Sequence, residues 1–496
     1  MSEERRYGPR RLASLLSNDV AISPEQGNVW IQGLTADSRA VGPGTLFAAL
    51  PGAKADGAKF VPEAIEAGAA AIVVGKQQTL DGAFAVPIVR VDDPRRTLAL
   101  MASRYFARQP RTVAAVTGTN GKTSVAVFLR QIWEKAGHKA ASLGTIGLVA
   151  PDNVVPGNLT TPDPVKLHEI LADLAAADVT HLAMEASSHG LEQRRLDGVR
   201  LSAGAFTNLS RDHLDYHASL EDYLNAKLRL FDTLLPKGTA AIVDADQSEA
   251  ARVQRIAKER ELDFFGVGRK GETLKLISAT RMHDGSRLLI EAFGEKHYVP
   301  LPLVGAFQIS NALVAAAMAI ATGVEAKKAL AALSDLRGAS GRLELVGAHP
   351  SGAQVFVDYA HTPDALANAL KALRPHAARR LIVVFGAGGN RDPGKRPLMG
   401  EAADSFADRV IVTDDNPRSE DPATIRKAVI NGAKKAEEIG DRGVAIRTAI
   451  TGLREGDILL IAGKGHETGQ TIGDEVLPFS DQEEAKKALR AAGGRV

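Results

Sequence analysis

The chain has 496 residues, of which 45% are hydrophobic and 24% charged, and its 61 Lys and Arg residues nearly balance its 59 Asp and Glu residues. At roughly 150 residues per domain, this length predicts about three domains. The chain contains no cysteine, which excludes disulfides, thiolate zinc sites and cysteine nucleophiles. Balanced charge and the lack of an apolar signal core or of a run of about 20 apolar residues argue against nucleic-acid and membrane partners and predict a cytoplasmic protein.

Residues 1–110 are expected to form a small α/β domain. Short apolar runs at 29–31, 45–50 and 70–74 predict strands, with Pro-Gly turns between them. The polar stretch Thr35-Ala36-Asp37-Ser38-Arg39 interrupts this pattern. Asp and Ser often bind their own backbone in a turn, so these residues alone favour a turn, and a binding loop is the other reading.

A phosphate-binding loop is the clearest motif. A buried strand is predicted at 113–116, and Gly118-Thr119-Asn120-Gly121-Lys122-Thr123-Ser124 leads from it into a helix predicted at 125–136. In this geometry backbone N–H groups and the helix dipole face the anion. Lys122 could reach the β- and γ-phosphates, and the Thr123 hydroxyl could ligate Mg²⁺. The general motif has a glycine where this chain has Val116, so an ordinary strand-to-helix turn is the alternative.

Two further segments of the expected central domain, residues 111–341, carry polar side chains after predicted strands. Glu185 follows the strand 181–184, at the strand end where doubly wound sheets bind ligands. The stretch Asn208-Leu209-Ser210-Arg211-Asp212-His213-Leu214-Asp215 follows an apolar run at 203–206. A polar turn that begins a helix explains this second stretch equally well.

Lys227 is the least expected residue of this domain. Ser219 and Asp222 predict a capping box. The helix that follows carries an apolar stripe with Lys227 at its centre, made of Leu220, Tyr223, Leu224, Leu228, Phe231 and Leu235. In the more common arrangement, the stem packs on the stripe and the ammonium reaches water. Alternatively the amine points inward, where desolvation lowers its pKa and CO₂ can convert it into an anionic carbamate able to ligate a metal.

The remaining chain predicts an Ala-rich helix at 305–321, a hinge at 334–342 and a second doubly wound α/β domain at 342–496. Its predicted strands are 354–357, 381–385, 410–413 and 458–462, and its helices are 363–373, 395–406, 423–437 and one from Ser480. Charged residues and glycines follow all four strands, at 358–363, 386–392, 414–418 and 463–467. The loop at 386–392 lacks the Gly-x-Gly-x-x-Gly spacing, so no dinucleotide site is predicted.

Together these motifs resemble those of the Mur ligases, and the resemblance covers nearly the whole chain. It is carried by the stretches 118–123, 185–189, 208–215, Tyr223-x-x-x-Lys227, 358–363 and 415–418. The resemblance implies three α/β domains. These are a docking domain for a UDP-sugar peptide at 1–110, a central P-loop ATPase-type doubly wound domain that binds ATP at 111–341, and a Rossmann-like domain that binds an amino acid at 342–496.

The resemblance also implies roles for individual residues, with Lys122, His213 and Lys227 as the catalytic ones. ATP contacts are implied for Gly118, Thr119, Asn120, Gly121, Lys122, Thr123, Ser124, Asn311, Arg342 and Asp358. Two Mg²⁺ ions are implied, with Thr123, Glu185, His213 and carbamylated Lys227 as ligands. Contacts to the uridine-nucleotide peptide are implied for Ser38, Thr160, Thr161, Ser187, Gln193 and Arg195. Leu159 stands where relatives often have Asn. Contacts to diaminopimelate are implied for Arg391, Asp415, Asn416, Pro417, Arg418, Gly463 and Glu467.

The activity that the resemblance implies is that of the family members which add meso-diaminopimelate to UDP-N-acetylmuramoyl-L-alanyl-D-glutamate in peptidoglycan precursor synthesis. ATP would phosphorylate the D-glutamate side-chain carboxylate, and an amine would then displace phosphate from the acyl phosphate. A monomer is expected. Folylpolyglutamate synthetases share the loop and the chemistry, but the stretches 37–39 and 415–418 count against them. A P-loop ATPase used as a switch or motor is a further alternative, which dependence of ATP turnover on an amine acceptor would exclude.

Overall fold

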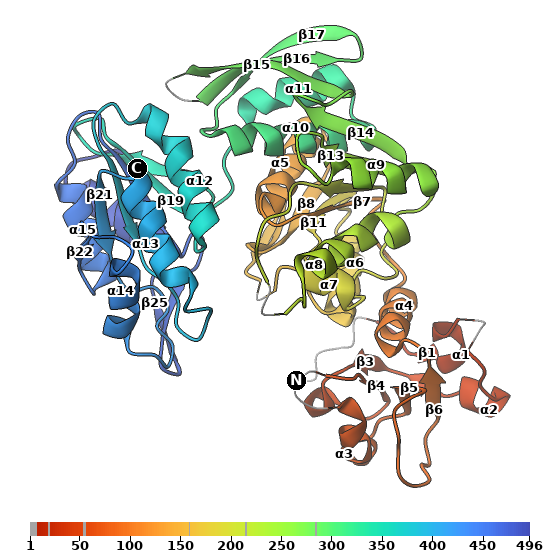
Figure 1. Ribbon diagram of the computed structural model, residues 1–496. Coiled ribbons are helices and arrows are strands. Elements are labelled where there is room, and N and C mark those ends of the chain that lie inside the picture. Colours follow the sequence, from red (N-terminus) through yellow and green to blue (C-terminus); the bar gives the residue numbers. More distant parts are fainter. Residues whose placement is uncertain (1–6, 18–19, 53–55, 158, 214–215, 283–284) are drawn as a thin grey trace. The chain divides into compact units, whose positions relative to one another are not determined.

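The computed structural model describes residues 7–17, 20–52, 56–157, 159–213, 216–282 and 285–496 (Figure 1). The chain forms two compact units. The first comprises residues 1–122, 129–266 and 317–324, and the second comprises residues 123–128, 267–316 and 325–496. Within the described ranges, no helix has both the length and the apolar character that crossing a membrane requires.

The first unit begins with a four-stranded parallel sheet in the order β3-β4-β5-β6, made of Gly33–Thr35, Thr45–Ala49, Ala71–Gly75 and Ile88–Val91. Alternate residues of a strand face opposite sides. One face of this sheet packs on α4 (Pro94–Phe106) and the other on α3 (Val61–Glu66). The remaining elements here are β1 (Arg10–Arg11), α1 (Leu12–Leu15), α2 (Pro24–Gly27) and β2 (Trp30–Ile31).

The same unit continues with a larger sheet in the order β10-β9-β8-β11-β7-β12-β13-β14. Its strands are β7 (Thr112–Thr117), β8 (Ala140–Gly144), β9 (Gly147–Ala150), β10 (Asn153–Val155), β11 (His181–Glu185), β12 (Ala203–Phe206), β13 (Ala240–Asp244) and β14 (Asp263–Gly268). The strands β8, β11, β7, β12 and β13 are parallel, so their carboxyl ends share one edge. The phosphate loop follows β7 at that edge.

Helices of the first unit cover one face of this sheet. They are α6 (Pro164–Ala176), α7 (Ser188–Glu192), α8 (Leu220–Arg229) and α9 (Ala250–Glu259), and their leucines and valines form one core with Val113, Leu182 and Met184. The helix α5 (Lys122–Lys135) follows the loop. The helix α8 continues into a π-helical turn at Leu230–Leu234.

The second unit contains an antiparallel meander of β15 (Leu274–Met282), β16 (Gly285–Ala292) and β17 (Glu295–Leu301), which pairs with the end of β14 at Val267. Figure 1 shows the meander beside α11 (Ala326–Ala332). The helix α10 (Ala306–Ala321) precedes α11 in the chain.

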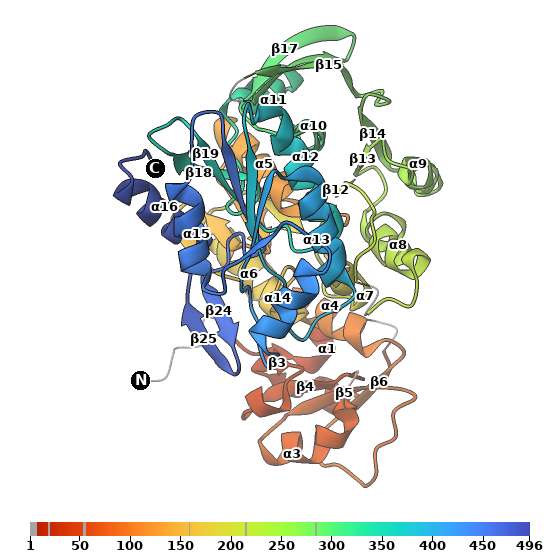
Figure 2. The same ribbon diagram turned by 60° about the vertical axis from the view of Figure 1, so that its left-hand side comes forward.

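The rest of the second unit is a six-stranded sheet in the order β18-β19-β23-β20-β21-β22. Its strands are β18 (Glu344–Ala348), β19 (Gln354–Asp358), β20 (Leu381–Phe385), β21 (Arg409–Val412), β22 (Glu437–Glu438) and β23 (Ile458–Ala462). The helices α12 (Pro363–Leu373), α13 (Lys395–Phe406) and α14 (Pro422–Ile430) cover one face. On the other face, α15 (Arg442–Thr451) and α16 (Asp481–Ala491) lie side by side (Figure 2). A separate two-stranded sheet is formed by β24 (Gly469–Ile472) and β25 (Glu475–Pro478).

Three sequence-based expectations are wrong: the end of one helix, the burial of one side chain and one capping interaction. The helix predicted at 423–437 ends at Ile430, and a short strand occupies Glu437–Glu438. Gly432 lies directly against α13, where an added Cβ would be 1.9 Å from the Pro397 carbonyl oxygen, so the chain turns there.

The other two corrections concern α8. Leu220, predicted on the buried stripe, is 45% exposed. Ser219 does accept from the Asp222 backbone N–H as an N-cap, but the reciprocal bond of a capping box is not formed.

Candidate active site

The phosphate loop has a backbone that only glycine adopts readily. Gly118 and Gly121 have φ values of 143° and 87°, in the left-handed region that favours glycine. A Cβ on Gly118 would lie 1.9 Å from Thr207 Oγ1. The ammonium of Lys122 donates to the carbonyl oxygens of Gly118 and Thr119, at 3.0 and 2.9 Å. The loop therefore wraps around the ammonium of Lys122 at the amino end of α5.

Residues that follow β12 hold this loop in place. Asn208 Oδ1 accepts from the Asn120 N–H at 3.0 Å, and the Ser210 N–H donates to Thr119 Oγ1 at 2.9 Å. Thr207 Oγ1 donates to the Asn120 carbonyl at 2.6 Å. The stretch 208–215 thus supports the loop from the neighbouring strand, beyond what a turn before a helix would do. Its residues 214 and 215 lie outside the described residues.

Lys227 lies beneath the phosphate loop. Its side chain is buried, with 1% of the residue exposed, and Nζ donates to the Gly118 carbonyl oxygen at 2.8 Å. The ammonium lies 4.1 Å from the centroid of the Tyr223 ring, and the Tyr223 hydroxyl donates to Thr119 Oγ1 at 3.3 Å. Burial, together with the nearby charge of Lys122, moves the pKa of Lys227 well below its usual value, and Asp212 opposes this shift. The reading in which this lysine extends into water is wrong.

Glu185 ends β11 as a buried carboxylate, 1% exposed. Its Oε1 accepts from the Thr145 N–H at 2.8 Å and its Oε2 from the Thr145 hydroxyl at 3.2 Å. The glycine at 144 is required here, because an added Cβ would lie 2.1 Å from Oε1. Thr145 and Thr160 are linked through their hydroxyls at 3.1 Å.

A hydrogen-bond network joins most residues expected to contact the uridine-nucleotide peptide. Thr161 Oγ1 donates to the Glu185 carbonyl at 3.0 Å and accepts from the backbone N–H of Ser187 at 3.1 Å. Arg195 donates to the Thr161 carbonyl at 2.6 Å and to Gln193 Oε1 at 2.8 Å. Five of the six predicted residues, Thr160, Thr161, Ser187, Gln193 and Arg195, therefore belong to one set of contacts with Glu185.

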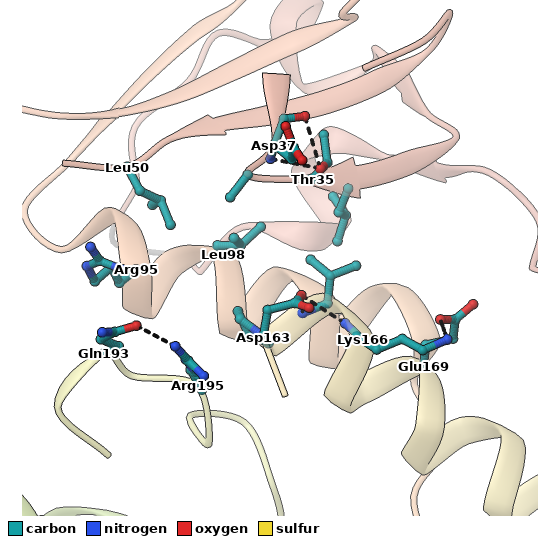
Figure 3. Close-up of a pocket in the computed structure, with 14 residues that line it drawn as sticks. Thr35, Asp37, Leu50, Arg95, Leu98, Asp163, Lys166, Glu169, Gln193 and Arg195 are labelled. Atoms are coloured by element: carbon teal, nitrogen blue, oxygen red, sulfur yellow. Dashed lines mark hydrogen bonds and ion pairs between the residues drawn. The ribbon is translucent and has the colours of Figure 1, made fainter. Parts of the chain in front are cut away.

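A cavity of about 480 Å³ lies between the first sheet and this network (Figure 3). Thr35 and Asp37 line one side, and Gln193 and Arg195 line the other. Ser38, the sixth predicted residue, begins a short 3-10 helix capped by Asp37, next to this cavity in the chain. The sequence missed Arg95 and Lys166, which also line the cavity as cations. Because they lie on ordinary helical surfaces, no local motif indicates them.

His213 adopts a left-handed backbone conformation with a φ of 53°. Its ring lies edge-on to that of His189, with the centroids 5.0 Å apart, and 6.0 Å from the Tyr223 ring. Within the described part of the chain, no group of three or more His, Asp or Glu side chains is arranged to hold a metal. Of the four predicted metal ligands, only Glu185 and His213 are of these residue types; the other two are Thr123 and Lys227.

The three ATP contacts predicted after residue 300 lie in the second unit. Asn311 donates to Gln308 Oε1 at 3.1 Å, and Gln308 donates to the Arg342 carbonyl at 3.3 Å. Asp358 accepts from the backbone N–H groups of Leu343 and Ala360, at 2.6 and 2.8 Å. Burial raises the pKa of Asp358 to about 6, although the charge of Arg342 opposes this. These partly buried polar contacts connect α10 and Arg342 with the segment that leads into the six-stranded sheet.

Arg342 and two residues at the start of α5 complete the predicted ATP contacts. The Arg342 guanidinium lies 4.6 Å from the Tyr359 ring centroid and donates to the Thr123 hydroxyl at 3.3 Å. Thr123 and Ser124 are both 4% exposed. The Thr123 hydroxyl is therefore held by a cation.

The loops after β21 and β23 converge at one edge of the six-stranded sheet. Asp415 and Asn416 are each 7% exposed, and Asn416 Nδ2 donates to Glu467 Oε2 at 2.9 Å. A Cβ on Gly463 would lie 2.5 Å from Asp415 Oδ2. The predicted diaminopimelate contacts Asp415, Asn416, Gly463 and Glu467 are thus brought together.

The loop after β20 approaches the same edge. Arg418 Nη1 donates to the Gly389 carbonyl at 2.7 Å. An added Cβ on Gly389 would lie 1.8 Å from the Pro417 carbonyl oxygen, so this glycine permits the close approach of the two loops. Arg391 is exposed, two residues beyond Gly389.

Sequence reasoning missed two buried cations at this edge. Lys464 is fully buried and donates to Asn416 Oδ1 and Glu467 Oε2, at 2.9 and 3.1 Å. Arg442 forms a fully buried ion pair with Asp481 at 2.6 Å and donates to the carbonyls of Asp414 and Ala462, at the ends of β21 and β23. The Gly-Lys-Gly spacing was a usable signal for Lys464, whereas Arg442 had none.

Fold and site together define a nucleotide-binding enzyme of the P-loop type with a second doubly wound domain. Three family models match: the Mur ligase family catalytic domain at residues 30–106, the Mur ligase middle domain at 116–319, and the Mur ligase glutamate ligase domain at 341–465. The chain belongs to the Mur ligase family.

Curated relatives align over nearly the full chain. A protein of Bradyrhizobium diazoefficiens named UDP-N-acetylmuramoyl-L-alanyl-D-glutamate–2,6-diaminopimelate ligase is 56% identical over 97% of this chain and 99% of its own length. A Brucella melitensis protein of the same name is 55% identical over 96% of this chain and 97% of its own. A solved structure of a ligase with that name is 32% identical, covers 98% of this chain and 99% of its own, and has a TM-score of 0.72.

More distant structures share the fold alone. A folylpolyglutamate synthase of Mycobacterium tuberculosis, solved with ADP and AMPPCP, is 18% identical and covers 74% of this chain with a TM-score of 0.62. The expected class, three α/β domains with a P-loop-type central domain and a Rossmann-like C-terminal domain, is confirmed by the full-length structural match.

Proposed function

We propose that this chain is an ATP-dependent ligase that joins meso-diaminopimelate to the D-glutamate side-chain carboxylate of UDP-N-acetylmuramoyl-L-alanyl-D-glutamate, in peptidoglycan precursor synthesis. The observation that carries the proposal is the phosphate loop with Lys122 and Lys227 on the Gly118 carbonyl, in a chain that aligns over 97% of its length with a relative of that name. The alternative of an ATPase switch or motor has no such support.

The chemistry follows from the residues of the loop. Lys122 and the backbone N–H groups of 118–124 bind the phosphates of ATP, and Asn311, Arg342 and Asp358 are proposed as further ATP contacts. The substrate carboxylate attacks the γ-phosphorus, so that ADP leaves and an acyl phosphate forms. The amine of diaminopimelate then attacks the acyl carbon, phosphate leaves and a proton is lost from the amine. Lys122 offsets the negative charge that gathers at the transferred group.

The donor groups near the loop fit a hard divalent cation. Magnesium prefers oxygen ligands, and the buried Glu185 carboxylate and the Thr123 hydroxyl supply them. His213 and Lys227 complete the proposed set, Lys227 as a carbamate, which its lowered pKa favours because the neutral amine is the form that reacts with CO₂. When bound, two Mg²⁺ ions would neutralise phosphate charge.

The substrate peptide is assigned to the 480 Å³ cavity and the network beside it. Arg195 and Gln193 offer donors to a uridine nucleotide from one side, and Ser38 lies in the segment on the other side. Thr160, Thr161 and Ser187 lead from the cavity toward Glu185. This path would carry the peptide from the docking domain to the phosphate loop.

We further propose domains at 1–110, 111–341 and 342–496, a monomer, and a cytoplasmic location without nucleic-acid or membrane partners. The matched family segments at 30–106 and 116–319 fall within the first two ranges, and the segment at 341–465 begins one residue before the third. The chain carries nearly equal numbers of basic and acidic residues, whereas proteins that bind nucleic acid or anionic membranes usually carry an excess of basic residues.

A coupled assay of ADP release tests the proposal. The purified chain is given ATP, Mg²⁺ and UDP-N-acetylmuramoyl-L-alanyl-D-glutamate, with and without meso-diaminopimelate, and the product is identified by mass. We expect ADP release to depend on both substrates and the tripeptide product to form in equal amount. ADP release that ignores the amine, or a preference for a folate glutamate acceptor, would refute the proposed function.

A further inference from the structure

Lys464 is the most completely buried cation among the loops proposed to bind diaminopimelate, with 0% of the residue exposed. It lies between Gly463 and Gly465, whose φ values are 116° and 53°. A Cβ on Gly465 would lie 2.6 Å from Tyr359 Cβ. These glycines let the turn pass close to its neighbours, and the turn directs the lysine side chain inward.

The buried ammonium determines how Asn416 is oriented. Asn416 Oδ1 accepts from Lys464 Nζ at 2.9 Å and from the Thr471 backbone N–H at 3.0 Å. Both partners can only donate, so the oxygen of the amide must face them and Nδ2 must face away. Nδ2 then donates to Glu467 Oε2 at 2.9 Å. The Asn416 amide is therefore already engaged within the protein.

The same ammonium determines which oxygen of Glu467 remains for a ligand. Lys464 Nζ and Asn416 Nδ2 both bind Oε2, at 3.1 and 2.9 Å. Glu467 is about one-third exposed, at 32%. Two donors thus fix its carboxylate through Oε2, and the partial exposure of the side chain leaves Oε1 as the oxygen that a ligand could use.

We propose that Lys464 is a positioning residue that determines specificity for an amino acid whose far end carries both an ammonium and a carboxylate. The proposal rests on the function proposed above. Lys464 does not touch the ligand. It orients Asn416 and Glu467, and its charge balances that of Glu467, so that an ammonium and a carboxylate can be accepted together. Without Lys464 the site becomes more negative by one charge, which favours a far end with an ammonium alone, as in L-lysine.

Kinetics of Lys464→Met test this role, because methionine keeps a long side chain without the charge. We expect KM for meso-diaminopimelate to rise by about tenfold or more, and the kcat/KM ratio of meso-diaminopimelate to L-lysine to fall by about as much. KM values for ATP and the UDP-dipeptide should change less than about twofold. Equal changes in all three KM values, or an unchanged amino-acid preference, would overturn the proposal.

Asp457→Asn provides the matched control. Asp457 precedes the same strand, β23, at its other end, and its buried carboxylate pairs with Arg379 and Arg380 at 3.4 and 2.6 Å. This variant should lower Tm while leaving KM for diaminopimelate unchanged. If it raised that KM as much as Lys464→Met, the effect would be general destabilisation and the proposal would be wrong.

A crystal structure of the wild-type protein with meso-diaminopimelate tests the same point without a variant, should Lys464→Met fail to fold. Lys464 Nζ should keep its bonds to Asn416 and Glu467, with no contact to the ligand. Direct contact between Nζ and the ligand, or loss of either bond, would contradict the positioning role. Wild-type protein that does not ligate diaminopimelate at all would instead refute the proposed function.

Discussion

Lys227 Nζ donates a hydrogen bond to the Gly118 carbonyl oxygen, 2.8 Å away, from the centre of a buried helix stripe. Lys122 donates to the same carbonyl oxygen at 3.0 Å. Burial, and after it the nearby charge of Lys122, lowers the pKa of Lys227 well below its usual value. The phosphate loop is therefore joined to an amine whose burial favours its neutral form.

Lys227→Ala should be nearly inactive, with kcat lower by about a hundredfold or more, since the proposed carbamate ligand is lost. Short carboxylates such as acetate should restore part of the activity by occupying the vacated position. The control is Lys237→Ala, which removes a lysine that is exposed and paired with Glu261. A crystal structure of the ATP complex that shows an unmodified ammonium at Lys227 would disprove carbamylation.

Lys122→Ala should abolish ligation while leaving the fold intact, because it removes the charge at the transferred phosphoryl group but no packing contact of the core. Product formation and the thermal melting curve are the two measurements. Lys135→Ala, at the other end of the same helix, should leave both unchanged. A well-folded Lys122→Ala protein with near-normal product formation would show that the phosphate-loop assignment is mistaken.

Local sequence signals predicted the elements that position the site. The strand, glycines and lysine at 113–122 gave the phosphate loop, since all its determinants lie within about ten residues. The helix at 363–373 was predicted at its observed bounds, because Thr362 caps it and Pro363 occupies its first turn. The helix from Ser480 likewise begins directly after that residue, which is its N-cap.

Contacts between distant segments were not predictable. Whether Lys227 reaches water or the loop depends on Gly118, more than a hundred residues away. The same holds for Lys464 and Asn416, which are 48 residues apart in sequence. The end of α14 at Ile430 depends on the close approach of Gly432 to α13. Such pairings are set by the packing of the sheet and leave no periodic pattern in the sequence.

His168 should make the stability of the protein depend on pH. Its side chain is 1% exposed, Nε2 donates to the Asp197 carbonyl at 3.0 Å, and burial lowers its pKa from 6.5 to about 4. Between these two values the unfolded chain binds a proton that the folded chain does not. The free energy of unfolding should therefore fall as pH decreases from 6.5 to 4, by about 3 kcal/mol from this residue.

Urea unfolding of His168→Gln across this pH range measures that contribution. Glutamine can still donate to the Asp197 carbonyl but cannot be protonated, so the fall in unfolding free energy should be smaller by about the same amount. His297→Gln, on the β17 edge of the meander, is the control and should keep the wild-type slope. Identical pH slopes for wild type and His168→Gln would mean that His168 does not titrate on unfolding.

Arg418 should distinguish meso-diaminopimelate from L-lysine. The two amino acids present the same attacking amine and differ in a carboxylate at the far end. Arg418 Nη1 is already bound to the Gly389 carbonyl at 2.7 Å, which leaves Nε and Nη2 as a planar pair suited to a carboxylate. With L-lysine this partly buried guanidinium would lose its partner, so efficiency with lysine should be lower by about a thousandfold.

Competition between the two amino acids, with the products separated by mass, tests this prediction. Arg418→Ala should lose most of the preference for meso-diaminopimelate, and Arg418→Lys should not restore it, because a single ammonium lacks the fork geometry. Arg447→Ala removes an arginine of α15 that pairs with Glu484, and it should keep the wild-type preference. Equal efficiency of the wild type with both amino acids would refute the predicted specificity. An Arg418→Ala variant that still prefers meso-diaminopimelate would show that another cation binds the carboxylate, and Arg391, exposed near the same edge, would be the next residue to replace.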